Sequence, residues 1–212
     1  MATEVIKVLL VDDHPVVRAG FHRLLEADGL VRVIAEAENG EEACSYYDAE
    51  RPDVVVLDLS MPGMGGLGAA RRLLAKDSEA KILVFSIHDN ETMLSRALQV
   101  GVMGYLTKQS APAILQEAVK TVAKGKMYID PDLIGRTLSF RQGSPLDRLT
   151  PREFEVFSLL AEGHNITEIA DTLSISPKTA GVHQTRIMNK LEVKNSVQLV
   201  RLALRQGVIT AQ

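Results

Sequence analysis

The first 125 residues repeat one pattern: a short apolar run rich in β-branched residues, then a loop, then a segment with helical periodicity. Nearly continuous apolar runs are typical of parallel strands that are buried on both faces. We therefore expect a doubly wound α/β domain with a five-stranded parallel sheet. The expected strands are residues 8–11, 31–35, 54–57, 82–85 and 102–106, and the expected helices are residues 16–27, 41–49, 67–76, 91–100 and 113–124.

The pattern changes after Lys124. Glycine and proline interrupt residues 126–147, which we interpret as a linker with a short helix near residues 133–138. From residue 148 the pattern is purely helical, and polar residues suited to helix N-caps stand at four places: Thr150, Asn165, Ser176 and Asn195. We therefore predict a domain of residues 1–125, a linker of residues 126–147 and a four-helix domain of residues 148–212.

The composition narrows the classes of protein. The chain has 212 residues, of which 46% are hydrophobic and 24% charged, as in globular proteins rather than disordered or fibrous ones. It has no apolar run long enough to cross a membrane and no signal-peptide pattern, so we expect a cytoplasmic protein without a membrane partner. Its one cysteine, Cys44, cannot form an internal disulfide, and we expect it to pack within a helix.

The net charge of −3 conceals a division along the chain. Residues 1–125 carry 13 basic and 18 acidic side chains, whereas residues 174–212 carry six basic side chains and one acidic one. A basic segment at one end is a candidate for contact with nucleic acid. The alternative is that these charges are simply the solvated faces of helices.

Reactive polar residues follow four of the five expected strands. Asp12 and Asp13 follow the first strand, Asp58 the third, Ser86 the fourth, and Lys108 lies just beyond the fifth. Ligands bind outside the carboxyl ends of the strands in such sheets, and these side chains would all meet there.

The chemistry of these residue types favours aspartyl phosphorylation. Neighbouring carboxylates repel one another unless a cation joins them, and their hard oxygen atoms favour Mg²⁺. One carboxylate could then attack a phosphoryl group while a lysine neutralises the phosphoryl oxygens. Each residue alone has an ordinary explanation, as a helix cap, a turn residue or a solvated lysine. All of them together at one edge of the sheet are much harder to explain in that way.

With these residues, the first domain resembles the receiver domain of two-component response regulators. The matching segments are VDDHP, VVVLDLSMPGMGG, VFS and GYLTK. The resemblance implies a flavodoxin-like fold in which Asp58 accepts a phosphoryl group from a phosphohistidine on a sensor histidine kinase. It also implies that the domain catalyses only its own Mg²⁺-dependent phosphorylation and dephosphorylation, so that the protein is not an enzyme acting on other substrates.

The resemblance assigns further roles. Asp13, Asp58 and the backbone carbonyl of Ser60 would hold Mg²⁺ or Mn²⁺, with Asp12 acting mainly through a metal-bound water. Lys108 would contact the phosphoryl group, and Ser86 and Tyr105 would form a switch pair in which the hydroxyl moves to the phosphate and the ring turns inward. Two residues, Pro62 and Gly66, would shape the loop after Asp58. Ile87 departs from the family pattern, because many receivers carry a smaller residue at that position.

The basic end has the layout of a helix-turn-helix. Residues 166, 169, 170 and 173 form one apolar stripe, and Ser176-Pro177 opens the next helix after a short turn. On that helix Ala180, Gln184, Ile187 and Leu191 share one side. The opposite side carries Val182 among polar residues, which suits contact with a thymine methyl group and with base edges in a major groove. The alternative is a small helical bundle that binds proteins.

This segment closely resembles the LuxR-type DNA-binding domain, so the whole chain resembles a NarL/FixJ-type regulator. The resemblance extends over LTPREFEVFSLLAEGHNITEIADTLSISPKTAGVHQTRIMNKLEVKN. It implies that the helix of residues 177–191 enters the major groove of double-stranded DNA and that the helix of residues 196–206 supplies a contact between two copies in a homodimer. The candidate DNA-binding residues are Lys178, Thr179, Val182, Thr185, Arg186, Asn189 and Lys190. Gly181 departs from the family, where a larger residue is common.

The sequence therefore predicts a transcription regulator that phosphorylation activates. One alternative is an aspartate-nucleophile phosphatase, but such enzymes carry a second acid where this chain has Ser60. Another is a DNA-binding protein whose receiver serves only as an interaction module. Nucleotide binding is not expected, because no glycine-rich phosphate loop follows the first strand.

Overall fold

A computed structural model describes residues 5–87, 89, 91–137 and 144–209. The chain divides into two compact units, one formed by Met1–Asp89 with Ala97–Gly135 and the other by Asn90–Arg96 with Arg136–Gln212. Among the described residues, no helix has both the length and the apolar character needed to span a membrane.

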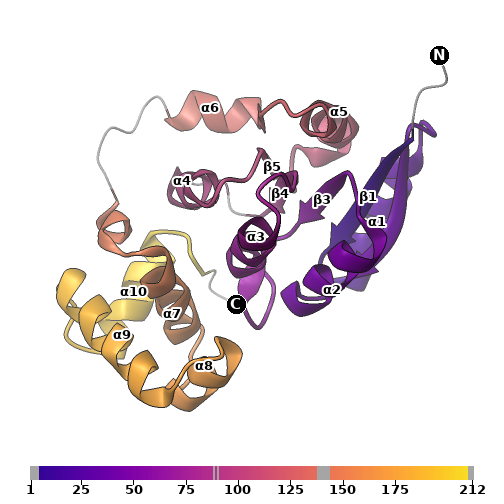
Figure 1. The fold of residues 1–212 in the computed structure, drawn as a ribbon. Coiled ribbons are helices and arrows are strands. Elements are labelled where there is room, and N and C mark those ends of the chain that lie inside the picture. The colour runs from indigo at the N-terminus through magenta and orange to yellow at the C-terminus, as the bar shows by residue number, and fades with distance from the viewer. Residues whose placement is uncertain (1–4, 88, 90, 138–143, 210–212) are drawn as a thin grey trace. The chain divides into compact units, whose positions relative to one another are not determined.

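The first unit is built on a parallel sheet, of which Figure 1 labels β1, β3, β4 and β5. The strand order is β2-β1-β3-β4-β5-β6. Its strands are β1 (Ile6–Val11), β2 (Val31–Ala37), β3 (Val54–Leu57), β4 (Ile82–Ser86), β5 (Gly104–Thr107) and β6 (Tyr128–Ile129). Its helices are α1 (Pro15–Glu26), α2 (Gly40–Glu50), α3 (Gly65–Lys76) and α5 (Ala111–Ala123), and α4 (Glu91–Val100) crosses the boundary between the two units. The predicted doubly wound α/β arrangement is confirmed.

The sheet has six strands, so the prediction of five was wrong by one. The additional strand, β6, pairs in parallel with β5 through Tyr128 and Ile129. Gly125 follows the C-cap of α5 in the left-handed conformation, with a φ of 73°, and allows the chain to return to the sheet. Two residues are too few to show a strand periodicity, and these two lie in the segment interpreted as a linker.

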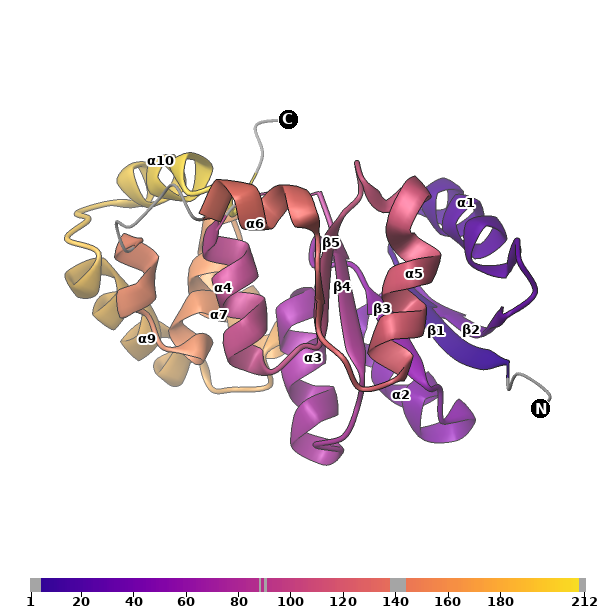
Figure 2. The same cartoon turned by 90° about the horizontal axis from the view of Figure 1, so that it is seen from above.

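Both faces of the sheet are covered, which explains the continuous apolar runs. All residues of β3, β4 and β5 are buried. Helices α1 and α5 pack on one face, and α2 and α3 pack on the other (Figure 2). Val8, Val56 and Phe85 belong to the core beneath α1 and α5, together with Leu25 of α1 and Leu115 of α5.

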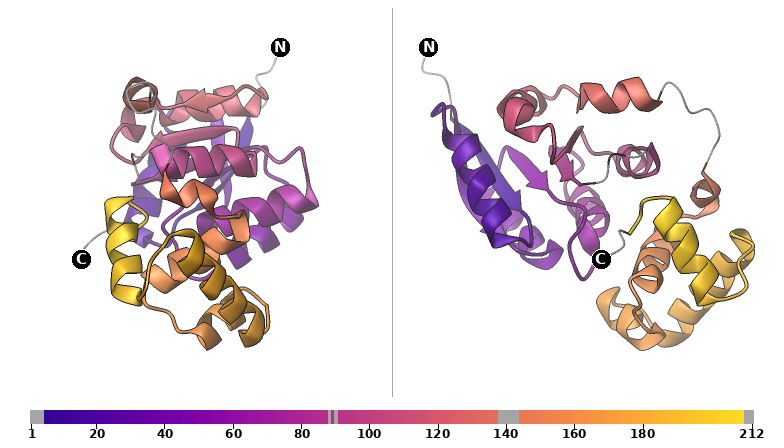
Figure 3. Two further views of the ribbon diagram at one scale, coloured as in Figure 1. Left: turned by 90° about the vertical axis from the view of Figure 1, so that its left-hand side faces the viewer. Right: turned by 180° about the vertical axis from the view of Figure 1, so that it is seen from behind.

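The second unit contains the helix-turn-helix segment. After α6 (Pro131–Thr137) and a 3₁₀ turn, η1 (Pro145–Arg148), the chain forms α7 (Pro151–Ala161), α8 (Ile166–Thr172), α9 (Pro177–Lys190) and α10 (Ser196–Arg205). Figure 3 shows these four helices, coloured from orange to yellow, gathered into one bundle in which α7 contacts the other three. The predicted N-caps are confirmed, because the side chains of Thr150, Asn165, Ser176 and Asn195 each accept a backbone hydrogen bond.

Candidate functional site

The backbone of the sheet brings four strand ends together. The amide of Asp58 donates to the carbonyl of Val11 at 2.9 Å, which places Asp58 beside the acid pair that follows β1. The amide of Lys108 donates to the carbonyl of Ser86 at 2.8 Å, which holds the loop after β5 against the end of β4. The side chains predicted to converge therefore do so.

Lys108 bridges two buried carboxylates. Its Nζ donates to Oδ2 of Asp12 at 2.6 Å and to Oδ2 of Asp58 at 2.8 Å, and these two aspartates are 1% and 0% exposed. Burial alone would lower the pKa of Lys108, but the charges of the two carboxylates and the hydrogen bonds to them outweigh it, so that the pKa is raised. Lys108 is therefore held as a cation at the centre of the acid cluster.

Asp58 is a carboxylate in an unfavourable place for charge. Burial raises the pKa of Asp58, and the attraction of Lys108 together with the hydrogen bond from the amide of Ser60 offsets that rise only in part. The negative charge of Asp12 raises it further. A divalent cation would stabilise the ionised form of such a group, because a bound ion is the largest local charge in a site.

The acid cluster fits a hard metal ion. One ligand atom from each of Asp12, Asp13, His14 and Asp58 lies within 4.8 Å of the others. Oδ1 of Asp13 is buried, yet it has no hydrogen-bond partner among the described residues, although Nδ1 of His14 lies 2.8 Å away. A buried carboxylate oxygen without a hydrogen bond leaves a coordination position available, and three carboxylates suit Mg²⁺ or Mn²⁺ better than a softer ion. The donor set therefore fits the metal that the sequence predicted.

The loop after Asp58 is shaped by close backbone contacts. The amide of Ser60 donates to Oδ1 of Asp58 at 3.1 Å. A side chain at Gly66 would bring a Cβ atom to 2.0 Å from the carbonyl oxygen of Asp58, so only glycine fits there. The structural role predicted for Gly66 is confirmed, and this contact fixes the path of the chain past the carboxylate of Asp58.

Ser86 and Tyr105 form a hydrogen-bonded pair beside Asp58. Both side chains are fully buried, on the neighbouring strands β4 and β5. Burial raises the pKa of Tyr105, and the hydrogen bond with Ser86 opposes that rise only in part. The tyrosine hydroxyl is therefore protonated over the physiological range. Ile87, the next residue after Ser86, is 48% exposed.

The helix α9 exposes the face that the sequence assigned to DNA. Its inner face contains Ala180, Ile187 and, at the end of the helix, Leu191, all of which are buried. Val182 is 44% exposed, which a packing role would not explain. The following predicted residues are exposed: Lys178, Thr179, Val182, Thr185, Arg186 and Asn189. A Cβ atom added at Gly181 would meet nothing within 4 Å.

Lys190 differs from the other predicted DNA-binding residues. Its Nζ pairs with Oε2 of Glu153 at 2.6 Å, and Glu153 is buried in the first turn of α7. Burial would raise the pKa of Glu153, but the hydrogen bonds from Lys190 and Thr150 outweigh it and lower the pKa. The structure therefore places Lys190 in the contact between α9 and α7 rather than among the free side chains.

Two residues of the first unit take part in the site although the sequence pattern did not mark them. His14 contributes to the acid cluster, and its position directly after the aspartate pair could have indicated this. Arg18, one turn into α1, donates from Nη1 to the carbonyl oxygen of Asp12 at 2.6 Å and pairs with Glu36 and Glu38 of the β2 region. No local motif marks Arg18, because its two acidic partners lie in and just after β2.

Comparison with known proteins identifies the family. Residues 8–120 match the family described as "Response regulator receiver domain", and residues 147–203 match "Bacterial regulatory proteins, luxR family". The response regulator UvrY of Escherichia coli strain K12 is 36% identical over 213 residues, which cover 98% of this chain and 97% of UvrY. The chain is a response regulator of the NarL/FixJ type.

Solved structures of RcsB, among them one from Salmonella enterica serovar Typhimurium, are similar to this chain over both units. One, bound to the promoter rprA in the presence of the phosphomimetic BeF₃⁻, is 30% identical with a TM-score of 0.73, covering 93% of this chain and 98% of that one. Another, of two RcsB dimers bound to two parallel DNAs, is 31% identical with a TM-score of 0.62, covering 98% and 100% of the two chains. The chain is accordingly a phosphorylation-dependent transcription regulator with a DNA-binding domain rather than an enzyme acting on other substrates.

Proposed function

We propose that Asp58 is the phosphorylated residue and that a sensor histidine kinase is the donor. The observation that carries this proposal is the contact of Lys108 with both Asp12 and Asp58 inside a cluster of three carboxylates. A lysine in this position can move from a carboxylate to a phosphoryl oxygen without leaving the site. The proposed boundaries of the receiver, the linker and the DNA-binding domain remain 1–125, 126–147 and 148–212.

The residues of the chain have distinct roles in this reaction. An oxygen of the Asp58 carboxylate attacks phosphorus, the bond between phosphorus and the donor imidazole nitrogen breaks, and that nitrogen keeps the electron pair and takes a proton. Lys108 then neutralises one phosphoryl oxygen, and the hydroxyl of Ser86 donates to another. Asp12, Asp13, Asp58 and the carbonyl of Ser60 would hold Mg²⁺ or Mn²⁺, which lowers the repulsion between the carboxylate and the phosphoryl group. Hydrolysis of the acyl phosphate by water in the same pocket would end the signal.

The switch is proposed to pass through Ser86 and Tyr105. These side chains are joined by a hydrogen bond, so movement of the serine hydroxyl toward a phosphoryl oxygen would break or redirect that bond. The resemblance implies that the tyrosine ring turns inward in this switch, and in this structure the ring is already fully buried.

We also propose that α9 reads double-stranded DNA. The exposed Lys178 and Arg186 suit phosphates or base edges, and the exposed Val182 suits a thymine methyl group. The RcsB structures with DNA include dimers, and we propose that this chain also binds DNA as a homodimer with α10 in the contact between copies. A regulator of this kind acts on chromosomal DNA, so we propose that it works in the cytoplasm.

The proposed function is tested with acetyl phosphate and Mg²⁺. The full chain, Asp58→Asn and the surface control Asp48→Asn are incubated with the phosphodonor, and the acyl phosphate, the mass in light scattering and the DNA selected from a random pool are measured. We expect phosphorylation and a change in mass or DNA affinity for the wild type and Asp48→Asn only. An acid-labile phosphate on Asp58→Asn would show that another residue is the acceptor.

The phosphatase alternative has its own test. Ser60 stands where such an enzyme would carry its second acid, so this position offers no carboxyl group to protonate the leaving oxygen of a phosphate ester. We expect no turnover of p-nitrophenyl phosphate above that of Asp58→Asn. Turnover by the wild type alone would favour a phosphatase.

A further inference from the structure

Asp130, the residue that follows β6, connects three parts of the first unit. It is 1% exposed. Its Oδ2 accepts hydrogen bonds from the amide of Thr107 at 3.1 Å, from Oγ1 of Thr107 at 3.0 Å and from Oγ of Ser110. Its Oδ1 accepts from the amide of Asp132 at 3.1 Å, as an N-cap of α6 does. One carboxylate therefore holds the loop between β5 and α5 and also begins α6.

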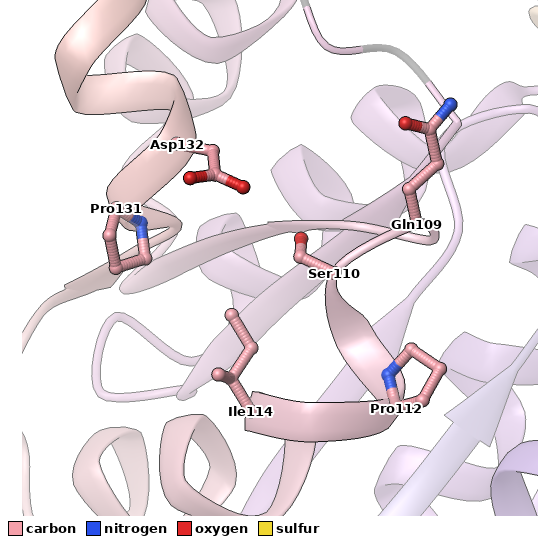
Figure 4. A pocket seen from close by; sticks show the side chains of 6 residues that line it. All are labelled: Gln109, Ser110, Pro112, Ile114, Pro131 and Asp132. Atoms are coloured by element: carbon pink, nitrogen blue, oxygen red, sulfur yellow. The ribbon is translucent and has the colours of Figure 1, made fainter.

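In the loop between β5 and α5, Ser110 contacts Asp130 instead of capping α5. Ser110 stands at the N-cap position of α5, but its side chain makes no capping hydrogen bond. Its hydroxyl contacts Asp130 and Thr107 instead. Figure 4 shows Ser110 among side chains from the start of α6 (Pro131, Asp132) and the start of α5 (Pro112, Ile114), where these residues line a small pocket. The loop is therefore organised around Asp130 rather than around α5.

Lys108 lies within the segment that Asp130 holds. Thr107 precedes it, Ser110 follows it by two residues, and its own amide donates to the carbonyl of Ser86 at 2.8 Å. The amide of Asp130 also donates to the carbonyl of Tyr105 at 2.9 Å. The backbone of Lys108 is thus fixed from β4 on one side and from Asp130 on the other.

The carboxylate of Asp130 is held in its charged form. Burial would raise its pKa, but the hydrogen bonds from Ser110, Thr107 and the amide of Asp132 outweigh burial and lower the pKa. A charged acceptor strengthens each of these hydrogen bonds. The anchor is therefore a strong one, although Asp130 lies outside the range that the sequence assigned to the receiver domain.

We propose that Asp130 is a positioning residue for Lys108. By fixing the loop of residues 107–110, it aims the ammonium group at the carboxylates of Asp12 and Asp58, and it ties the start of the linker to the phosphorylation pocket. This inference rests on the proposed role of Asp58 as the phosphorylated residue. Asp130 itself touches no reacting atom.

Two variants weaken the anchor from opposite sides. Asp130→Asn replaces one acceptor oxygen by an amide that cannot accept from the amide of Thr107. Ser110→Ala removes a donor but leaves the capping contact of Asp130 with α6 intact, so it carries the test where Asp130→Asn fails to fold. Asp132→Asn is the matched control, because it removes an exposed carboxylate from the same helix start.

The measurements separate positioning from general damage. We expect Asp130→Asn and Ser110→Ala to lower the rate of phosphorylation by acetyl phosphate roughly tenfold, with the double variant no slower than Asp130→Asn. The affinity for Mg²⁺, measured by calorimetry, should stay unchanged or increase, because Lys108 competes with the cation for the carboxylates. Asp132→Asn should match the wild type in both measurements.

The outcomes that overturn the inference are distinct from failure of the proposed function. Rates for both anchor variants within twofold of the wild type, or a loss of Mg²⁺ affinity in parallel with the loss of rate, would overturn the positioning role alone. A wild type that takes up no phosphoryl group at Asp58 would overturn the proposed function and this inference together.

Discussion

At the scale of single residues, the pocket is held together by charges that would be unfavourable apart. Asp12 and Asp58 are buried, and each depends on the ammonium group of Lys108 for compensation. A carboxylate without such a partner in a buried site costs several kcal/mol. One lysine cannot neutralise two carboxylates, so the pocket keeps a net negative charge. A bound divalent cation would neutralise that charge.

Asp58→Asn should raise the melting temperature of the Mg²⁺-free protein by a few degrees at about pH 7. The raised pKa of Asp58 means that its ionised form is disfavoured in the folded protein, so removing the charge stabilises the fold. Lys108 keeps Asp12 as its partner at 2.6 Å in the variant. Thermal unfolding followed by circular dichroism measures the effect.

Two further conditions check the cause of that stabilisation. The difference should begin to shrink as the pH falls through the raised pKa of folded Asp58, and it should disappear below the unfolded pKa, where Asp58 is neutral in both states. Adding Mg²⁺ should stabilise the wild type more than the variant by mass action. A variant that melts below the wild type in Mg²⁺-free buffer would contradict the expectation.

At the scale of an element, α9 divides its charged residues between two tasks. Lys178 and Arg186 are exposed on the face that carries Val182. Lys190, on the same helix, pairs with the buried Glu153. The sequence grouped all the basic residues of α9 together, because periodicity shows which side of a helix faces outward but not which exposed lysine reaches back to an acid on another helix.

Lys178→Ala and Lys190→Ala should therefore give opposite results. Lys178→Ala should weaken DNA binding without changing stability. The slope of log Kobs against log salt concentration should become less steep by about 0.9. Lys190→Ala should lower the free energy of unfolding by about 1 kcal/mol. This is less than for a fully buried ion pair, because the ammonium group of Lys190 is partly exposed to solvent. Fluorescence anisotropy over a salt series and thermal melts measure the two effects. A less steep salt dependence of DNA binding for Lys190→Ala would show that Lys190 contacts DNA.

At the scale of the whole molecule, the small net charge is the sum of an acidic part and a basic part of the chain. The acidic first unit carries the carboxylates of the pocket, and residues 174–212 carry the basic side chains of the proposed DNA surface. Each unit also has its own core, beneath α1 and α5 in the first and among α7, α8 and α9 in the second. Separate cores are what allow domains to fold as separate units.

Calorimetry of the full chain should resolve two unfolding transitions. Mg²⁺ is proposed to bind at the carboxylate pocket, so it should raise the transition of the first unit and leave that of the second in place. Short promoter-like DNA should act mainly on the second. A single transition that Mg²⁺ moves as a whole would show that the two cores unfold together.

The sequence was sufficient where a feature is local or repeats at a fixed interval. The parallel sheet followed from the apolar runs, and the four helix starts followed from Thr150, Asn165, Ser176 and Asn195. The convergence of Asp12, Asp58 and Lys108 was also predictable, because the carboxyl ends of parallel strands share one edge.

Only the tertiary structure decided the contacts between residues far apart in the chain. The sixth strand, the pairing of Arg18 with Glu36 and the anchor of Asp130 on Thr107 each join segments that no local pattern relates. The pairing of Lys190 with Glu153 likewise depends on how two helices pack. Sequence periodicity determines which side of an element is buried, whereas hydrogen bonds and ion pairs depend on distances that exist only after the elements have packed together.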